Sequence, residues 1–258
     1  LDRNGDVADL VAMAGALWWF WWVRGHLTEG RDRLRRALAL GEDLPLDPAL
    51  LARALDGAGA LAEAQGDIDQ AVACHQRAHE LWTRAGDQAG QARSLVNLGI
   101  IELHDRGNPE RARTLYEAAL AAYRAAGDQE GVAAALKNLG DAALTADDVE
   151  RAAALYEESL GIARSLHDTR GVAAILTSLG ALAFFRGDHQ RAIALYEESL
   201  PLWRALDDVP GTALALGNLG EALYHAGEVA RAKSLYTESL ALARDLGDRQ
   251  GIAFAQSH

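Results

Sequence analysis

The sequence predicts an all-α fold, a right-handed α-α superhelix built from antiparallel helical hairpins. Three observations predict it. The chain repeats itself with a period of about 40 residues, apolar residues recur three and four apart in both halves of each period, and glycine or acidic residues separate the halves. No segment shows the alternation of β-branched and polar residues that is typical of strands.

The repeat is clearest in a short string that ends in glycine. Asn-Leu-Gly or Ser-Leu-Gly recurs at steps of 41, 40 and 40 residues, and its glycines are Gly99, Gly140, Gly180 and Gly220. A Leu-Tyr pair follows each string, with the tyrosines at Tyr116, Tyr156, Tyr196 and Tyr236. Because glycine inside a helix costs about 1 kcal/mol relative to alanine, its recurrence indicates closely packed helices. We expect each glycine to face an alanine of the second helix, with the tyrosine beside that contact.

The chain divides into three parts. Residues 1–46 form a divergent, tryptophan-rich helical hairpin, and residues 47–248 form five tandem hairpins. These five span about 47–86, 87–127, 128–167, 168–207 and 208–247. Residues 249–258 correspond to the first helix of a truncated further repeat. We therefore expect the chain to be a piece of a larger protein.

The turns within and between hairpins carry residues that end one helix and begin the next. In the string Arg186-Gly187-Asp188, the glycine can adopt the left-handed conformation and the aspartate can cap the following helix. Asp147-Asp148 replaces Gly-Asp in one such turn, and His167-Asp168 does so in another. These departures leave the predicted helices intact.

The first hairpin contains an unusual aromatic run. Trp18, Trp19, Trp21 and Trp22 occupy neighbouring positions of one predicted helix and therefore point around it. We expect them to contact a preceding domain of the same polypeptide. An aromatic ligand pocket and a contact between copies are the alternatives. The apolar run 11–23 would span about 20 Å, too short for a membrane helix, and acidic residues precede it where a signal peptide is basic.

Composition narrows the classes of function. The formal charge of −12 opposes binding to nucleic acid or to anionic membranes. The single cysteine, Cys74, excludes an intrachain disulfide and suits the cytoplasm. No phosphate-binding glycine motif, serine nucleophile motif or closely spaced metal-ligand set is present. The sequence therefore predicts a binding protein rather than an enzyme, without cofactor or metal.

Together, the Asn-Leu-Gly string, the Gly-Asp turn, the Arg-Ala pair and the Leu-Tyr-Glu-Glu-Ser-Leu string resemble the tetratricopeptide repeat (TPR) in its longer variant. The resemblance covers nearly all of residues 47–248. The aromatic run, with the following Arg24-Gly25-His26, is similar to the opening of repeat regions in bacterial STAND signalling ATPases and maltose-activator-type transcription regulators. It implies an interaction or effector-sensing domain that binds a protein, a peptide or a small effector. A self-assembling or adaptor scaffold without a sensing role is the alternative.

The resemblance also implies which residues line the concave groove. They are Asn97, Lys137, Asn138, Asp141, Thr177, Phe185, Asn218, Glu221 and His225. Asparagine amides can bond the backbone of an extended peptide, but hydrogen bonding between helices explains them equally well. Lys137 by itself does not form a clamp for a terminal carboxylate.

Overall fold

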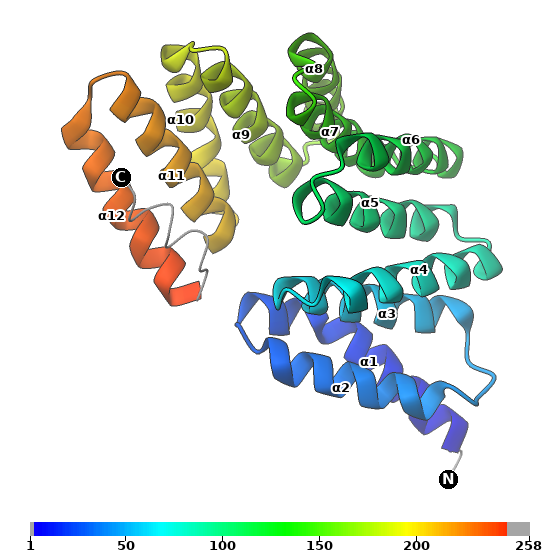
Figure 1. The fold of residues 1–258 in the computed structure, drawn as a ribbon. Helices are drawn as coiled ribbons and strands as arrows, with labels where there is room; N and C mark the ends of the chain where they lie inside the picture. Colours follow the sequence, from blue (N-terminus) through cyan, green and yellow to red (C-terminus); the bar gives the residue numbers. More distant parts are fainter. Residues whose placement is uncertain (1–2, 247–258) are drawn as a thin grey trace. The chain divides into compact units, whose positions relative to one another are not determined.

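The computed structural model describes residues 3–246, which form twelve α-helices and no strand (Figure 1). The all-α class is confirmed. The helices are α1 (Arg3–Val23), α2 (Leu27–Gly41), α3 (Pro48–Ala64), α4 (Ile68–Ala85), α5 (Gln88–His104), α6 (Pro109–Ala126), α7 (Gln129–Thr145), α8 (Val149–Ser165), α9 (Thr169–Phe185), α10 (His189–Ala205), α11 (Val209–His225) and α12 (Val229–Leu246). The truncated repeat predicted at 249–258 lies outside the described residues.

The chain forms two compact units, residues 1–138 and residues 139–258, and the boundary falls within α7. In the first unit, α1 packs against both α2 and α3, α3 pairs with α4, and α5 pairs with α6. Leu34 of α2 and Leu61 of α3 are fully buried in the core that the first hairpin shares with α3. The tryptophan-rich hairpin is therefore the first layer of this unit.

The second unit repeats this arrangement. Here α9 pairs with α10, α11 pairs with α12, and α10 also packs against α11. Its largest core cluster includes Leu216 and Leu223 of α11, which are fully buried. Within each unit, these hairpins therefore bury one face against the partner helix and another against the neighbouring hairpin, as expected for a helical repeat.

The turns follow the predicted chemistry. Gly187 has φ +77°, and the side chain of Asp188 accepts a hydrogen bond from the backbone N–H of Arg191. Three non-glycine residues adopt the same left-handed conformation in the corresponding turns, namely Asp147, His167 and Asp207. Since aspartate and histidine tolerate this region better than most residues, these turns keep their geometry at a modest cost in stability.

The recurring glycines pack differently from the expectation. A Cβ atom added to Gly180 would lie 2.5 Å from Cε1 of Tyr196, and its three nearest atoms all belong to that ring. The same holds for Gly99 under Tyr116 and for Gly140 under Tyr156. Each glycine therefore faces a tyrosine ring rather than an alanine, because the flat ring needs the space that a Cβ would occupy.

Candidate functional site

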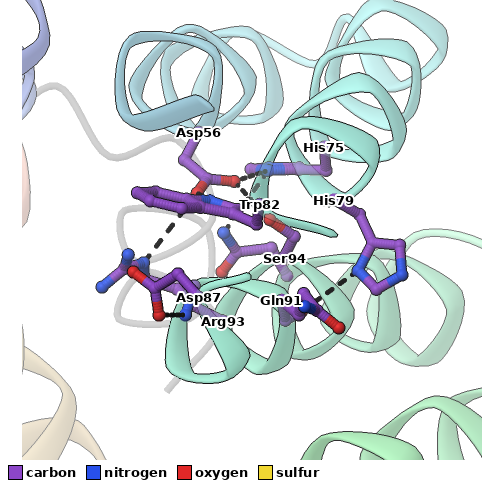
Figure 2. A network of polar contacts seen from close by, with 10 residues as sticks. Asp56, His75, His79, Trp82, Asp87, Gln91, Arg93 and Ser94 are labelled. Atoms are coloured by element: carbon purple, nitrogen blue, oxygen red, sulfur yellow. Dashed lines mark hydrogen bonds and ion pairs between the residues drawn. The ribbon is translucent and has the colours of Figure 1, made fainter. Parts of the chain in front are cut away.

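A buried carboxylate joins three helices of the first unit. Asp56 of α3 accepts hydrogen bonds from the indole Nε1 of Trp82 at 2.9 Å and from Oγ of Ser94 at 3.0 Å. Nδ1 of His75 lies 3.2 Å from the same carboxylate (Figure 2). Asp56 is 8% exposed, so this carboxylate needs these donors in place of water. The network fixes α3, α4 and α5 relative to one another.

His75 stands where the later hairpins have tyrosine. Its fully buried ring lies against Gly59, where an added Cβ would come within 2.6 Å of Cε1. Because Nδ1 faces the Asp56 carboxylate, we assign its proton to that nitrogen. The amide of Asn97 also lies 3.4 Å from Nδ1, so this predicted groove residue makes a contact between helices. Burial raises the pKa of nearby Glu63.

Arg93 contacts the buried network and reaches the surface. Its guanidinium lies 5.3 Å from the ring centroid of Trp82, and its Nε lies 3.9 Å from Oδ2 of Asp56 (Figure 2). The side chain is half exposed, and its terminal nitrogens have no partner among residues 3–246. Arg53 of α3 has the same register, six residues before a packing glycine, and is also exposed. The first unit therefore presents two arginines at equivalent places on neighbouring first helices.

The second unit contains a neutral counterpart of the buried carboxylate. Nε1 of Trp203 donates to Oγ1 of Thr177 at 3.2 Å, and the Thr177 hydroxyl donates to the carbonyl of Ala173. Thr177 is 7% exposed. It was expected to line the groove, but the structure uses it in the core, because the indole of the second helix needs an acceptor.

Asp141 of α7 contacts side chains of its own hairpin and of the next one. The hydroxyl of Tyr156 donates to Oδ1 of Asp141 at 2.7 Å, and the hydroxyl of Ser178 lies 3.4 Å from the same oxygen. Burial and the Asp141 charge raise the pKa of Tyr156 far above its usual range. Asn138 and Asn218, in contrast, are half buried and make no side-chain hydrogen bond within the described chain.

Aromatic rings gather near the end of α9 and α11. His225 stacks on His189 with a centroid distance of 5.3 Å, and Phe184 lies at the same distance from His225. Phe185, which was expected in the groove, is 58% exposed and takes no part in this cluster. Glu221 and Lys137 are half buried.

The four tryptophans of α1 separate into different environments. Trp21 is 5% exposed and belongs to the core of the first hairpin, so it offers no surface to another domain. Trp18 and Trp22 are half buried against the same core. Trp19 is 44% exposed and stacks on Trp22 with a centroid distance of 5.0 Å. The interdomain contact remains a prediction, now centred on Trp19.

Among residues 3–246, no group of three or more histidine, cysteine or acidic side chains is placed to hold a metal ion. None of the twelve helices is both long and apolar enough to cross a bilayer.

Comparison with known proteins identifies the repeat. The sequence profile of the tetratricopeptide repeat matches residues 50–125, 92–165 and 171–245. No curated protein matches the sequence significantly. Among solved structures, the chain is similar to NprR in complex with its cognate peptide NprX, with 16% identity, a TM-score of 0.78, and coverage of 99% of this chain and 73% of that one.

Two further structures extend the comparison. A Rap protein complexed with competence and sporulation factor has 14% identity, a TM-score of 0.72, and coverage of 96% and 80%. A STAND protein with a tetratricopeptide repeat sensor, from Pyrococcus horikoshii, has 15% identity, a TM-score of 0.68, and coverage of 98% of this chain and 39% of that one. These likenesses show the fold, a helical-repeat solenoid. Because the profile matches cover most of the sequence, the chain belongs to the tetratricopeptide repeat family, which has a protein-interaction fold.

Proposed function

We propose that this chain is the effector-sensing domain of a larger bacterial signalling or transcription-regulatory ATPase, and that it binds an extended peptide along its first helices. The observation that carries the proposal is the network from Asp56 to Arg93, which holds an exposed guanidinium over the Trp82 ring. A cation held in this way is preorganised for a carboxylate. Arg53 supplies a second cation in the same register.

The first helices of the later hairpins lack these arginines. The positions equivalent to Arg53 and Arg93 carry alanine or leucine in the later hairpins, at Ala134, Ala174 and Leu214. Asn138 and Asn218 keep amides that make no hydrogen bond within the described residues. We therefore infer that the arginines of the first unit bind an acidic side chain or a terminal carboxylate of a peptide, and that the asparagine amide of each unit can bond peptide backbone groups within that unit.

The three structural comparisons support a peptide ligand and a sensing role. NprR was solved with its cognate peptide and the Rap protein with competence and sporulation factor, and the third structure is a STAND protein with a tetratricopeptide repeat sensor. In a sensor, a ligand that binds one conformation of the protein more tightly than the other increases the population of that conformation. We also propose that the protein lies in the cytoplasm and that an ATPase module is attached to this chain.

A display library of random peptides with free C-termini tests the proposal. The chain should enrich peptides that contain Asp or Glu or depend on their terminal carboxylate. For a selected peptide, Arg93→Ala should raise the dissociation constant about tenfold or more in calorimetry, because a charge-assisted hydrogen bond is lost. Combining Asn138→Ala with Asn218→Ala should weaken binding while helicity is retained.

The matched control is Arg113→Ala on α6. Arg113 pairs with Glu110 and Glu117 on the second-helix surface, and its loss should leave the affinity unchanged. A chain that enriches no peptide would contradict the proposal. Peptides that bind Arg93→Ala and the asparagine double variant as tightly as the wild type would contradict the assigned surface.

A further inference from the structure

The first hairpin leaves an apolar face uncovered. Among the described residues, seven of the thirteen exposed large apolar side chains lie on α1 or α2. Four of them, Leu10, Met13, Leu17 and Phe20, are spaced three, four and three residues apart and therefore form one stripe along α1. We call these four residues the α1 stripe. Three of them line a groove of about 670 Å³ together with Leu40 of α2.

The equivalent face of α3 in the next hairpin is packed against other helices. Counting from the equivalent turn glycines, Gly25 and Gly66, the α1 stripe corresponds to residues 41 positions later, which are Leu51, Ala54, Ala58 and Leu61. Ala54 and Leu61 are fully buried, and all four pack in the core that α3 shares with α1. The first hairpin thus covers this face of α3, whereas the corresponding face of α1 is exposed. A second helical hairpin matches its shape.

The charges beside the groove are self-complementary. Glu29 and Asp32 precede Arg33 and Arg36 along α2, and all four line the groove. If a second α2 runs antiparallel across a two-fold axis near residues 32 and 33, each acidic end faces a basic end. The present partner of Arg33 is Glu29 on the same helix, and both side chains are more than half exposed. Such exposed pairs are weak and can exchange partners.

Net charge does not oppose a contact between copies at the first hairpin. Residues 1–46 contain seven acidic and six basic residues, so the first hairpin is nearly neutral. The whole chain carries a formal charge of −12, so the remaining residues of two copies repel each other. The first hairpin therefore adds little electrostatic repulsion to a contact between two copies.

We propose that two copies of this chain associate head to head, with their α1 stripes in contact and with Glu29 and Asp32 of one copy facing Arg33 and Arg36 of the other. The arrangement closes at a dimer, since a two-fold contact uses the same patch on both copies. The α1 stripe and Leu40 offer about 500 Å² of apolar surface per copy, and the charged rim extends it toward the roughly 800 Å² per partner of a stable interface. This inference is independent of the peptide-binding proposal.

Sedimentation of the purified chain tests the dimer. At concentrations up to about 100 µM, the wild type should shift from monomer to dimer, with a dissociation constant of about 1–100 µM. Met13→Glu combined with Leu17→Glu should raise that constant at least about 100-fold, because like charges would be buried against each other. Val229→Glu on α12, where an equally exposed apolar side chain changes, is the matched control and should dimerise as the wild type does. Circular dichroism verifies that each variant is folded.

Charge reversal tests the two-fold geometry. Glu29→Arg with Asp32→Arg makes the rim wholly basic, and Arg33→Glu with Arg36→Glu makes it wholly acidic. Each variant should be monomeric alone, and the mixture should form a mixed dimer. A monomeric wild type, a dimer that survives the α1 stripe substitutions, or a mixture without the mixed dimer would each overturn the proposal. Association with another protein or a flanking domain in place of a second copy would give the first of these results.

Discussion

Packing of the recurring glycines can be tested with two glycines of the second unit that sit in opposite environments. Gly180 of α9 lies under Tyr196, where an added Cβ would be 2.5 Å from Cε1 and 2.8 Å from Cδ1. Gly161 of α8 is exposed, and an added Cβ would meet nothing within 4 Å. We compare Gly180→Ala with Gly161→Ala, which make the same chemical change inside a helix.

The two substitutions share the gain in helix propensity and differ in the contact with a tyrosine ring. Alanine is favoured over glycine inside a helix, which stabilises either variant by about 1 kcal/mol. In Gly180→Ala the contact distance must grow from 2.5 Å to the ordinary 3.4 Å or more, so a rigid, nearly buried ring must move by almost 1 Å. Overpacking of this kind costs about 1–3 kcal/mol or slightly more. The net expectation is about 0–2 kcal/mol of destabilisation for Gly180→Ala and about 1 kcal/mol of stabilisation for Gly161→Ala.

Urea unfolding followed by circular dichroism measures both free energies. Because repeat proteins can unfold in parts, the transitions should be compared by a second probe, tryptophan fluorescence, to which Trp203 of the same unit contributes. Repeating Gly180→Ala in a Tyr196→Leu background should reduce its cost, since a flexible side chain can give way. Gly180→Ala that is as stable as Gly161→Ala would refute the glycine–ring account.

Three further perturbations follow from other contacts. Asp56→Asn should lower the free energy of unfolding by about 1–3 kcal/mol in urea titration, because the new NH₂ group faces donors and leaves one buried donor unpaired. Asp147→Gly should raise the free energy of unfolding by about 1 kcal/mol, measured as a higher melting temperature, because φ +61° strains a side-chain-bearing residue. Burial raises the pKa of Tyr123 from 10 to about 12, so its neutral phenol stabilises the fold fully below pH 10. That contribution should be lost as the pH rises from 10 to 12, and helicity should fall together with the appearance of phenolate absorbance.

The positions of the helices were predictable because their signals are local. The hairpin predicted at about 168–207 corresponds to α9 and α10, which span Thr169–Phe185 and His189–Ala205. Apolar spacing defines the length of each helix, and the Gly-Asp turn defines where one ends and the next begins. The turn at Asp147 kept its place even without glycine, since the aspartate adopts the left-handed conformation itself.

The buried network was not predictable in the same way. Asp56, His75 and Ser94 come from three helices, and their contacts span 19 and 38 residues. No local pattern relates them. One signal was available: His75 replaces the recurring tyrosine in the same hairpin in which an acidic residue precedes the glycine. Two simultaneous departures from a repeat indicate that the residues compensate each other.

The orientation of the tryptophans also needed the structure. Neighbouring positions on α1 predicted indoles around the helix, but the sequence does not say which side α2 and α3 would cover. Packing against both helices buries Trp21 and leaves Trp19 at the surface. The exposed apolar residues of α1 are aliphatic as well as aromatic, and Leu10, Met13 and Leu17 form no local sequence signal as distinct as four neighbouring tryptophans.

Repeat packing restricts where this chain can recognise a ligand. The position three residues before the packing glycine carries a hydrogen-bond acceptor, Asp56 or Thr177, in the two hairpins where tryptophan follows 26 residues later. Where alanine takes the place of that tryptophan, as at Ala163 and Ala243, the earlier position is lysine or glycine. The acceptor therefore serves the indole, and this position belongs to the core wherever tryptophan is present. If the proposed function holds, ligand specificity comes from side chains that keep polar atoms at the surface, such as Arg53, Arg93, Asn138 and Asn218, and substitutions there should change affinity more than stability.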